Sequence, residues 1–328
     1  MRRREFIGLL AGASVARLLT APAAAQAAKV PHIGILSPAG PETTWFAEGL
    51  RQGLSEHGYV DGQNIKLEFR WAYGRFDRLP GLAAELVALD VDVIIAGVTQ
   101  ASLAAKAATR TVPIVMVAVG DPLGTGLVES LARPGGNITG TSNMTTDVVG
   151  KQMELLKELD PGLSRVAVLW NPANAIFQAR QVQEAKAASR RLGLLIDFFA
   201  ASAPEAFDAA FAAMRRDKVR ALHVLGDPVF TQHLDALLAQ IAKERLPAVG
   251  SQREFAERGG LLAYGPNYYD AARRSAAYVH KILGGTKPGE LPVEQPTKFE
   301  LLVNLKSAEA LGVTIPESIL TRADEVID

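Results

Sequence analysis

The sequence predicts an α/β protein made of two doubly wound, Rossmann-like lobes joined by a multi-crossing hinge. Its 328 residues are about twice the length of a typical domain of about 150 residues, which favours two lobes. From Val30 onward, short apolar runs alternate with segments of helical periodicity, as in parallel sheets that are covered by helices. This alternation restarts after the turn at residues 160–162, so each lobe is expected to have its own sheet.

The first 27 residues are typical of a secretory signal peptide. Basic residues 2–4 precede a short apolar stretch and a tail of small residues over 21–27. The apolar stretch contains Arg17 and is too short for a membrane span of about 20 residues. Residues 3–7 resemble a twin-arginine export signal, and an ordinary export signal with a chance arginine pair is the alternative. We expect cleavage near Ala25 to Ala27 and a periplasmic mature protein.

The first β/α series begins at Val30. Trp45, Phe46, Leu50 and Leu54 recur at the spacing of a buried helix face. The run 91–96, which is apolar except for Asp92, is typical of a strand buried on both faces of a parallel sheet. The expected strands are 30–36, 65–71, 91–96, 114–119 and 137–140, and the expected helices are 43–57, 77–89 and 100–109. A further short helix is expected to end at residues 133–136, because Pro134 and the two glycines after it stop a helix.

The second series and the tail follow the same logic. The expected helices are 146–159, 175–192, 205–215, 230–244, 269–283 and 307–311, and the expected strands are 165–170, 194–199, 219–225, 247–249, 261–264 and 299–304. If helix 269–283 belongs to the first lobe and strand 299–304 to the second, the chain passes between the lobes three times, which makes a hinge. The expected parts are a first lobe of 30–141 plus 269–290, a second lobe of 146–264 plus 298–328, and hinge segments near 141–146, 264–269 and 291–298.

The composition excludes several functional classes. The 35 basic and 35 acidic side chains cancel, so the chain lacks the charge expected of a general nucleic-acid or anionic-membrane binder. Without cysteine it cannot form disulfides, thiolate zinc sites, cysteine nucleophiles or the N-terminal lipid anchor of a bacterial lipoprotein. The sequence also lacks the common nucleotide-binding, hydrolase and metalloprotease motifs. The five histidines have no metal-ligand spacing, so we predict no metal site, and with the nucleotide-binding motifs missing we predict no cofactor.

The carboxyl ends of the predicted strands supply the candidate binding residues, because ligands of open parallel sheets bind there. These candidates are Ser37, Trp45, Thr99, Gln100, Asp121, Asn171, Asp227 and Tyr264. A helix that starts near Thr99 offers free amides to a carboxylate, and Asp227 suits an ammonium group, so the pair suits an amino-acid-like zwitterion. Structural roles are the alternatives: caps for Asp121, Asp227 and Thr99, a turn at Asn171, and core packing for the aromatic rings.

Several motifs then indicate a known family. They are GLRQGL at 49–54, DRLP at 77–80, VDVI at 91–94, PIV at 113–115, SLARPGGNITG at 130–140, NLK at 304–306, ALG at 310–312 and RADEVI at 322–327. Through them the chain resembles the substrate-binding proteins of ABC transporters, of the tryptophan/tyrosine type, with the type I periplasmic binding protein fold. The matching segments extend over essentially the whole mature chain.

The resemblance implies a function without catalysis. A protein of this kind captures a small molecule, here best guessed as amino-acid-like and possibly aromatic, in the cleft between its lobes and delivers it to a membrane permease. The resemblance places the eight candidate residues at the cleft. We expect a monomer because the cleft must open and close. A periplasmic ligand sensor that signals to a receptor is the alternative, and an enzyme is a further one.

Overall fold

The computed structural model describes residues 29–41, 44–143, 145–296 and 298–328, so the expected signal peptide lies outside the described residues. Residues 31–328 form one unit, which contains two sheets. Among the residues that the structure describes, no helix has both the length and the apolar character needed to cross a membrane.

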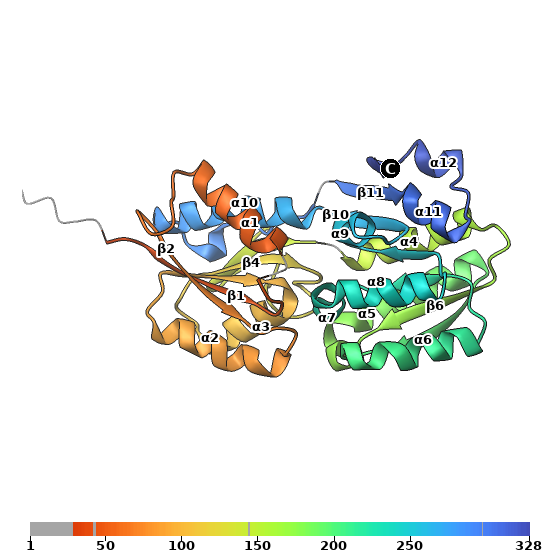
Figure 1. Ribbon diagram of the computed structural model, residues 1–328. Coiled ribbons are helices and arrows are strands. Elements are labelled where there is room, and N and C mark those ends of the chain that lie inside the picture. Colours follow the sequence, from red (N-terminus) through yellow and green to blue (C-terminus); the bar gives the residue numbers. More distant parts are fainter. Residues whose placement is uncertain (1–28, 42–43, 144, 297) are drawn as a thin grey trace, which may run out of the picture. The chain divides into compact units, whose positions relative to one another are not determined.

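The first sheet has five parallel strands in the order β2-β1-β3-β4-β5 (Figure 1). The strands are β1 (His32–Ser37), β2 (Lys66–Trp71), β3 (Val93–Gly97), β4 (Ile114–Val119) and β5 (Ile138–Ser142). Alternate side chains of these strands point to opposite faces, and both faces are apolar and buried. One face packs against α1 (Thr44–Glu56) and α10 (Tyr268–Leu283), and the other packs against α2 (Leu79–Ala88) and α3 (Val98–Ala108).

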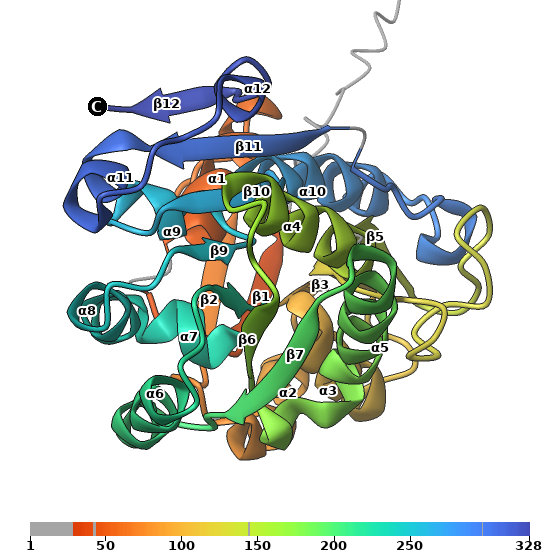
Figure 2. The same cartoon turned by 90° about the vertical axis from the view of Figure 1, so that its right-hand side faces the viewer.

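The second sheet has seven strands in the order β12-β11-β10-β9-β8-β6-β7 (Figure 2). They are β6 (Arg165–Trp170), β7 (Leu195–Ala200), β8 (Leu222–Val224), β9 (Ala248–Gly250), β10 (Leu262–Pro266), β11 (Phe299–Asn304) and β12 (Glu325–Ile327). Neighbouring strands are parallel except for β10 and β11, which are antiparallel.

Helices cover both faces of the second sheet as well. One face packs against α4 (Thr145–Leu159), α5 (Ala175–Leu192), α11 (Leu305–Leu311) and α12 (Glu317–Leu320). The other face packs against α6 (Phe207–Arg216), α7 (Pro228–Gln232) and α8 (Leu234–Lys243), and the short α9 (Arg253–Glu257) contacts β10 and β11. The predicted fold class, with two doubly wound lobes, is therefore confirmed. We call the first sheet with its four helices lobe 1, and the second sheet with its helices lobe 2.

Helix α10 follows a strand of lobe 2 but packs on α1 of lobe 1 (Figure 1). The two backbones approach closely at Gly49 and Gly53. A Cβ atom on Gly53 would lie 2.0 Å from the carbonyl oxygen of Arg273, and one on Gly49 would lie 2.5 Å from that of Tyr269. The chain thus enters lobe 2 after β5, returns to lobe 1 at α10 and enters lobe 2 again at β11, which accounts for the multiple crossings.

Some predicted elements are wrong or were missed. The short helix expected to end at residues 133–136 is absent, and the described residues 121–137 form turns instead. Gly124 and Gly126 interrupt this segment, Gly126 has a φ of +69°, and Lys106 donates hydrogen bonds to the carbonyl groups of residues 126 and 127. The helix expected over 230–244 is divided at His233 into α7 and α8. The short α9, α12 and β12 were not predicted.

Candidate ligand-binding cleft

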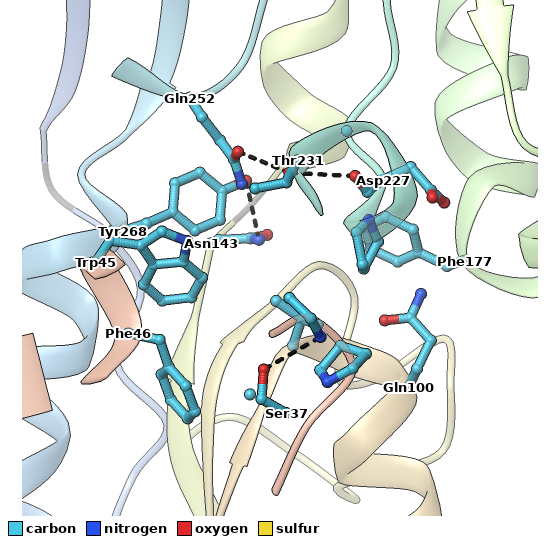
Figure 3. A pocket seen from close by; sticks show the side chains of 16 residues that line it. Ser37, Trp45, Phe46, Gln100, Asn143, Phe177, Asp227, Thr231, Gln252 and Tyr268 are labelled. Carbon is cyan, nitrogen blue, oxygen red and sulfur yellow. Dashed lines mark hydrogen bonds between the residues drawn. The ribbon is translucent and has the colours of Figure 1, made fainter. Parts of the chain in front are cut away.

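A cavity lies between the lobes at the carboxyl ends of β1, β3 and β8 (Figure 3). It contains about 540 Å³ of space not filled by atoms, part of which is open to solvent. Its polar lining residues are Ser37, Gln100, Asn143, Asp227, Thr231 and Gln252. Asp227 is the one charged side chain among the described lining residues, so the cavity favours a ligand with a positively charged group.

Aromatic side chains form much of the cavity wall. The ring centroid of Trp45 lies 5.4 Å from that of Phe46 and 5.3 Å from that of Tyr268. Trp45 and Phe46 come from α1 and Tyr268 from α10, so the packing of these two helices sets this wall. Phe177 of α5 lies on the opposite side of the cavity (Figure 3). These rings provide an apolar surface for a planar group. Trp45 is only 7 % exposed, and among the described residues no acceptor pairs with its Nε1.

Asp227 is both a helix cap and the anionic group of the cavity. Its Oδ1 accepts hydrogen bonds from Asn171 Nδ2 at 3.0 Å and from the backbone N of Val229 at 2.9 Å, which caps α7. Its Oδ2 accepts a hydrogen bond from Asn174 Nδ2 at 2.7 Å. Burial raises the pKa of Asp227 to about 6, against the opposing effect of these donors. A carboxylate offers about four lone-pair positions, so the fourth can accept a hydrogen bond from a ligand.

The start of α3 is an anion-binding position in lobe 1. Strand β3 passes directly into α3 through Val98, whose φ of +53° is strained for a β-branched residue. In the part of the chain that the structure describes, no side chain caps this helix, so its first amides lack an intrahelical or side-chain acceptor there. Val98 and Gln100 line the cavity. The amides and the helix dipole there suit a carboxylate.

Polar contacts join the two lobes across the cleft. Gln100 Nε2 donates to Asn174 Oδ1 at 2.7 Å, and the backbone N of Gly40 donates to Gln232 Oε1 at 2.6 Å. Arg180 of lobe 2 forms a 2.7 Å ion pair with Asp121 of lobe 1. An apolar contact accompanies them, because Phe76 packs against the buried clusters of both lobes. The cleft is therefore closed in this structure.

The structure brings four of the eight predicted site residues together. Ser37, Trp45, Gln100 and Asp227 line the cavity. The other four lie outside its described lining, where each has a structural contact. Thr99 Oγ1 accepts a hydrogen bond from the backbone N of Gly120, and the Asp121 carboxylate accepts hydrogen bonds from Arg180 and from the backbone N of Gly124. Asn171 donates a hydrogen bond to Asp227 and accepts one from the backbone N of Ala173. The ring of Tyr264 stacks on that of Phe299.

Several lining residues were not among the candidates, and some carried a signal that could have found them. Gln252 follows the carboxyl end of β9, and Tyr268 follows that of β10, so the strand-end rule applies to both. Asn143 likewise follows β5. Phe177, inside α5, carried no such signal. Among the described residues, no group of three His, Cys, Asp or Glu side chains is placed to hold a metal ion.

Two α/β lobes that enclose a cavity between them and are joined by several chain crossings define the type I periplasmic binding protein class. The family follows from the sequence comparison. Residues 33–327 match the model of the family described as ABC transporter substrate binding protein, and the chain belongs to that family. This confirms the predicted resemblance and the predicted function as a substrate-binding protein of an ABC transporter. Proteins of this class work outside the cytoplasmic membrane.

Individual relatives agree with this assignment. A tyrosine-binding protein of Clostridioides difficile strain R20291 is 28 % identical over 267 residues, which cover 81 % of this chain and 76 % of that protein. An ABC domain from Streptococcus pneumonia, solved in complex with L-Trp, is 30 % identical, covers 90 % of this chain and 99 % of its own, and has a TM-score of 0.83. A ligand-free, open substrate-binding protein of Clostridium difficile is 25 % identical over 91 % of this chain and 99 % of its own, with a TM-score of 0.65.

Proposed function

We propose that the cleft binds an L-amino acid with an aromatic side chain. The observation that carries this proposal is a buried carboxylate, Asp227, in a cavity with an aromatic wall and no cationic side chain among its described lining residues. The ligand ammonium pairs with Asp227, and its ring lies against Trp45, Phe46 and Tyr268. The ligand carboxylate accepts from the amides at the start of α3. The ligands named for the relatives, tyrosine and L-Trp, are of this chemical class.

The proposed role in transport follows from closure of the lobes. Segments 141–146, 264–269 and 291–298 act as hinges, and the ligand favours the closed form because only that form offers contacts from both lobes. A membrane permease recognises the closed form and receives the ligand. The protein is exported by its signal peptide, residues 1–27, works in the periplasm as a monomer, and catalyses no reaction on the ligand.

Calorimetry with a ligand panel tests the proposal. L-Trp, L-Tyr and L-Phe should bind the chain that starts at Ala28, whereas L-Leu, L-Lys and glucose should bind much more weakly or not at all. Asp227→Ala should lower the affinity for the aromatic ligand at least about 30-fold, since loss of one partner of a buried charged pair costs about 2 kcal/mol or more.

Asp121→Ala is the matched control. Asp121 and Asp227 both stand in a Gly-Asp-Pro tripeptide after a strand, but Asp121 lies outside the described lining of the cavity. Its substitution should change the affinity by less than about fivefold, because it removes only a partly exposed ion pair. Equal effects of the two substitutions would refute the role of Asp227, and failure of every aromatic amino acid to bind would refute the ligand class.

A further inference from the structure

A chain of three side chains connects the lobes beside the cavity. Gln100 Nε2, in lobe 1, donates to Asn174 Oδ1 at 2.7 Å, and Asn174 Nδ2 donates to Asp227 Oδ2 at 2.7 Å. Asn174 is 6 % exposed and Asp227 is 5 % exposed, so the hydrogen bond between them is buried, and the one from the half-buried Gln100 to Asn174 is partly buried. The orientation of the Asn174 amide is therefore set by its protein partners.

The ionised carboxylate of Asp227 fixes both amide orientations. A carboxylate accepts hydrogen bonds and donates none, so Asn174 must present its Nδ2 to Asp227 and its Oδ1 to Gln100. Gln100 must then present its Nε2 to Asn174. Rotation of either amide by 180° would place two acceptors or two donors against each other. The charge on Asp227 thus determines, through Asn174, where the oxygen of Gln100 points.

The result is an acceptor in the cavity that has no donor. Gln100 Oε1 is buried, and among the described residues no donor pairs with it. Gln100 lines the cavity, and Figure 3 shows its oxygen on the side that faces the cavity interior. A buried carbonyl oxygen without a donor is unfavourable, so a ligand N–H group at this place would gain a ready hydrogen bond.

We propose that Gln100 Oε1 accepts a second hydrogen bond from the ligand ammonium that Asp227 holds, and that Asn174 is a positioning residue that aims Gln100 at it. This inference rests on the proposed function. An ammonium group has three N–H donors and can serve acceptors on both lobes at once. A hydroxyl group in its place has one donor, and a ligand without the amine has none. The cleft therefore selects amino acids over the corresponding hydroxy and desamino acids.

Calorimetry on Gln100→Met, a variant of similar length whose sulfur is a poor acceptor, tests the inference. With L-Trp its affinity should fall at least about tenfold. With indole-3-propionate, which lacks the amine, the affinity measured by competition should change by less than about twofold. Gln252→Met is the matched control: Gln252 also lines the cavity, but its Oε1 already accepts from Thr231 Oγ1 at 2.8 Å. It should leave the ratio of the two affinities unchanged.

A double variant tests the positioning role. Asn174→Leu should also lower the affinity for L-Trp, and in that background Gln100→Met should have an effect of less than about twofold, because Gln100 is no longer aimed. Independent effects of the two substitutions would overturn the role of Asn174. Equal losses for both ligands in Gln100→Met, or no loss for either, would overturn the role of Gln100. If L-Trp and the other aromatic amino acids do not bind the unaltered protein, the proposed function itself fails, which separates the two failures.

Discussion

Replacement of Gly53 by alanine tests the packing that places α10, and with it Tyr268, in lobe 1. The new Cβ atom would lie 2.0 Å from the carbonyl oxygen of Arg273, 2.8 Å from its carbonyl carbon and 2.9 Å from the Cβ of Ala276, where real Cβ contacts essentially never fall below 3.0 Å. Two of these obstacles are backbone atoms that no rotamer change can move. The helices must therefore separate by roughly 1 Å, and the cost lies at the upper end of the range for overpacked cores, about 3 kcal/mol.

Alanine offsets part of this cost, because it is favoured over glycine in a helix by about 1 kcal/mol. The net loss is then about 2 kcal/mol, which for a protein of this size lowers the melting temperature by about 4 °C. Gly81→Ala is the matched control, since Gly81 is exposed in α2 and a Cβ there would meet no atom within 4 Å. It should raise the melting temperature by about 2 °C. Thermal unfolding followed by circular dichroism measures both, and a Gly53→Ala protein as stable as the original would refute the close packing of α1 on α10.

Three further predictions concern charge and closure. Burial raises the pKa of Asp227 to about 6, so its carboxylate is ionised at neutral pH, but between about pH 4 and pH 6 the folded ligand-free protein holds a proton that the unfolded chain has released. The stabilisation that this proton provides is complete below about pH 4 and is lost as the pH rises through 6. Between pH 6 and pH 4 the free energy of unfolding should rise by about 2 kcal/mol relative to Asp227→Asn, and a constant difference in denaturant titrations would contradict this. Arg180→Ala should lower the ligand affinity by less than about fivefold in low salt and should have no effect in 0.5 M salt, because the ion pair of Arg180 with Asp121 is partly exposed. A loss of affinity that does not depend on salt would count against an ionic role of Arg180 in closure. Phe76→Ala should lower the ligand affinity about tenfold, because about 1.5 kcal/mol of apolar contact across the cleft is lost. It should also increase the radius of gyration of the ligand-free protein in X-ray scattering. An unchanged radius and an unchanged affinity would show that this contact does not favour closure.

The strand-end rule located part of the site from sequence but could not fix the direction of each side chain. Thr99 and Gln100 are neighbours at the start of α3, yet Gln100 lines the cavity and Thr99 turns towards Gly120. The rotation of this helix depends on Val98, whose positive φ no sequence rule would assign to a β-branched residue. The two Gly-Asp-Pro tripeptides are identical in sequence, and only the packing around them makes one aspartate a cavity residue and the other a contact across the cleft.

Other parts of the site depend on contacts between distant segments. Tyr268 joins the wall formed by Trp45 and Phe46 because α10 returns to lobe 1, and the periodicity of α10 alone does not say which sheet it covers. The expected short helix near residue 133 was wrong for a local reason, since Gly124 and Gly126 favour turns in this segment. Strand and helix order, by contrast, was readable because most elements are long and strongly periodic.

The contacts across the cleft are individually weak, and this suits a protein that must open. Among the described residues, the contacts between the lobes include one partly exposed ion pair, the hydrogen bonds donated by Gly40 and Gln100, and the packing of Phe76, each contributing about 1 kcal/mol. A ligand that touches only one lobe would bind both forms equally and shift nothing. The aromatic wall belongs mainly to lobe 1 and the carboxylate to lobe 2, so an amino acid with an aromatic side chain engages both parts only when the cleft is closed, and its binding energy can drive closure.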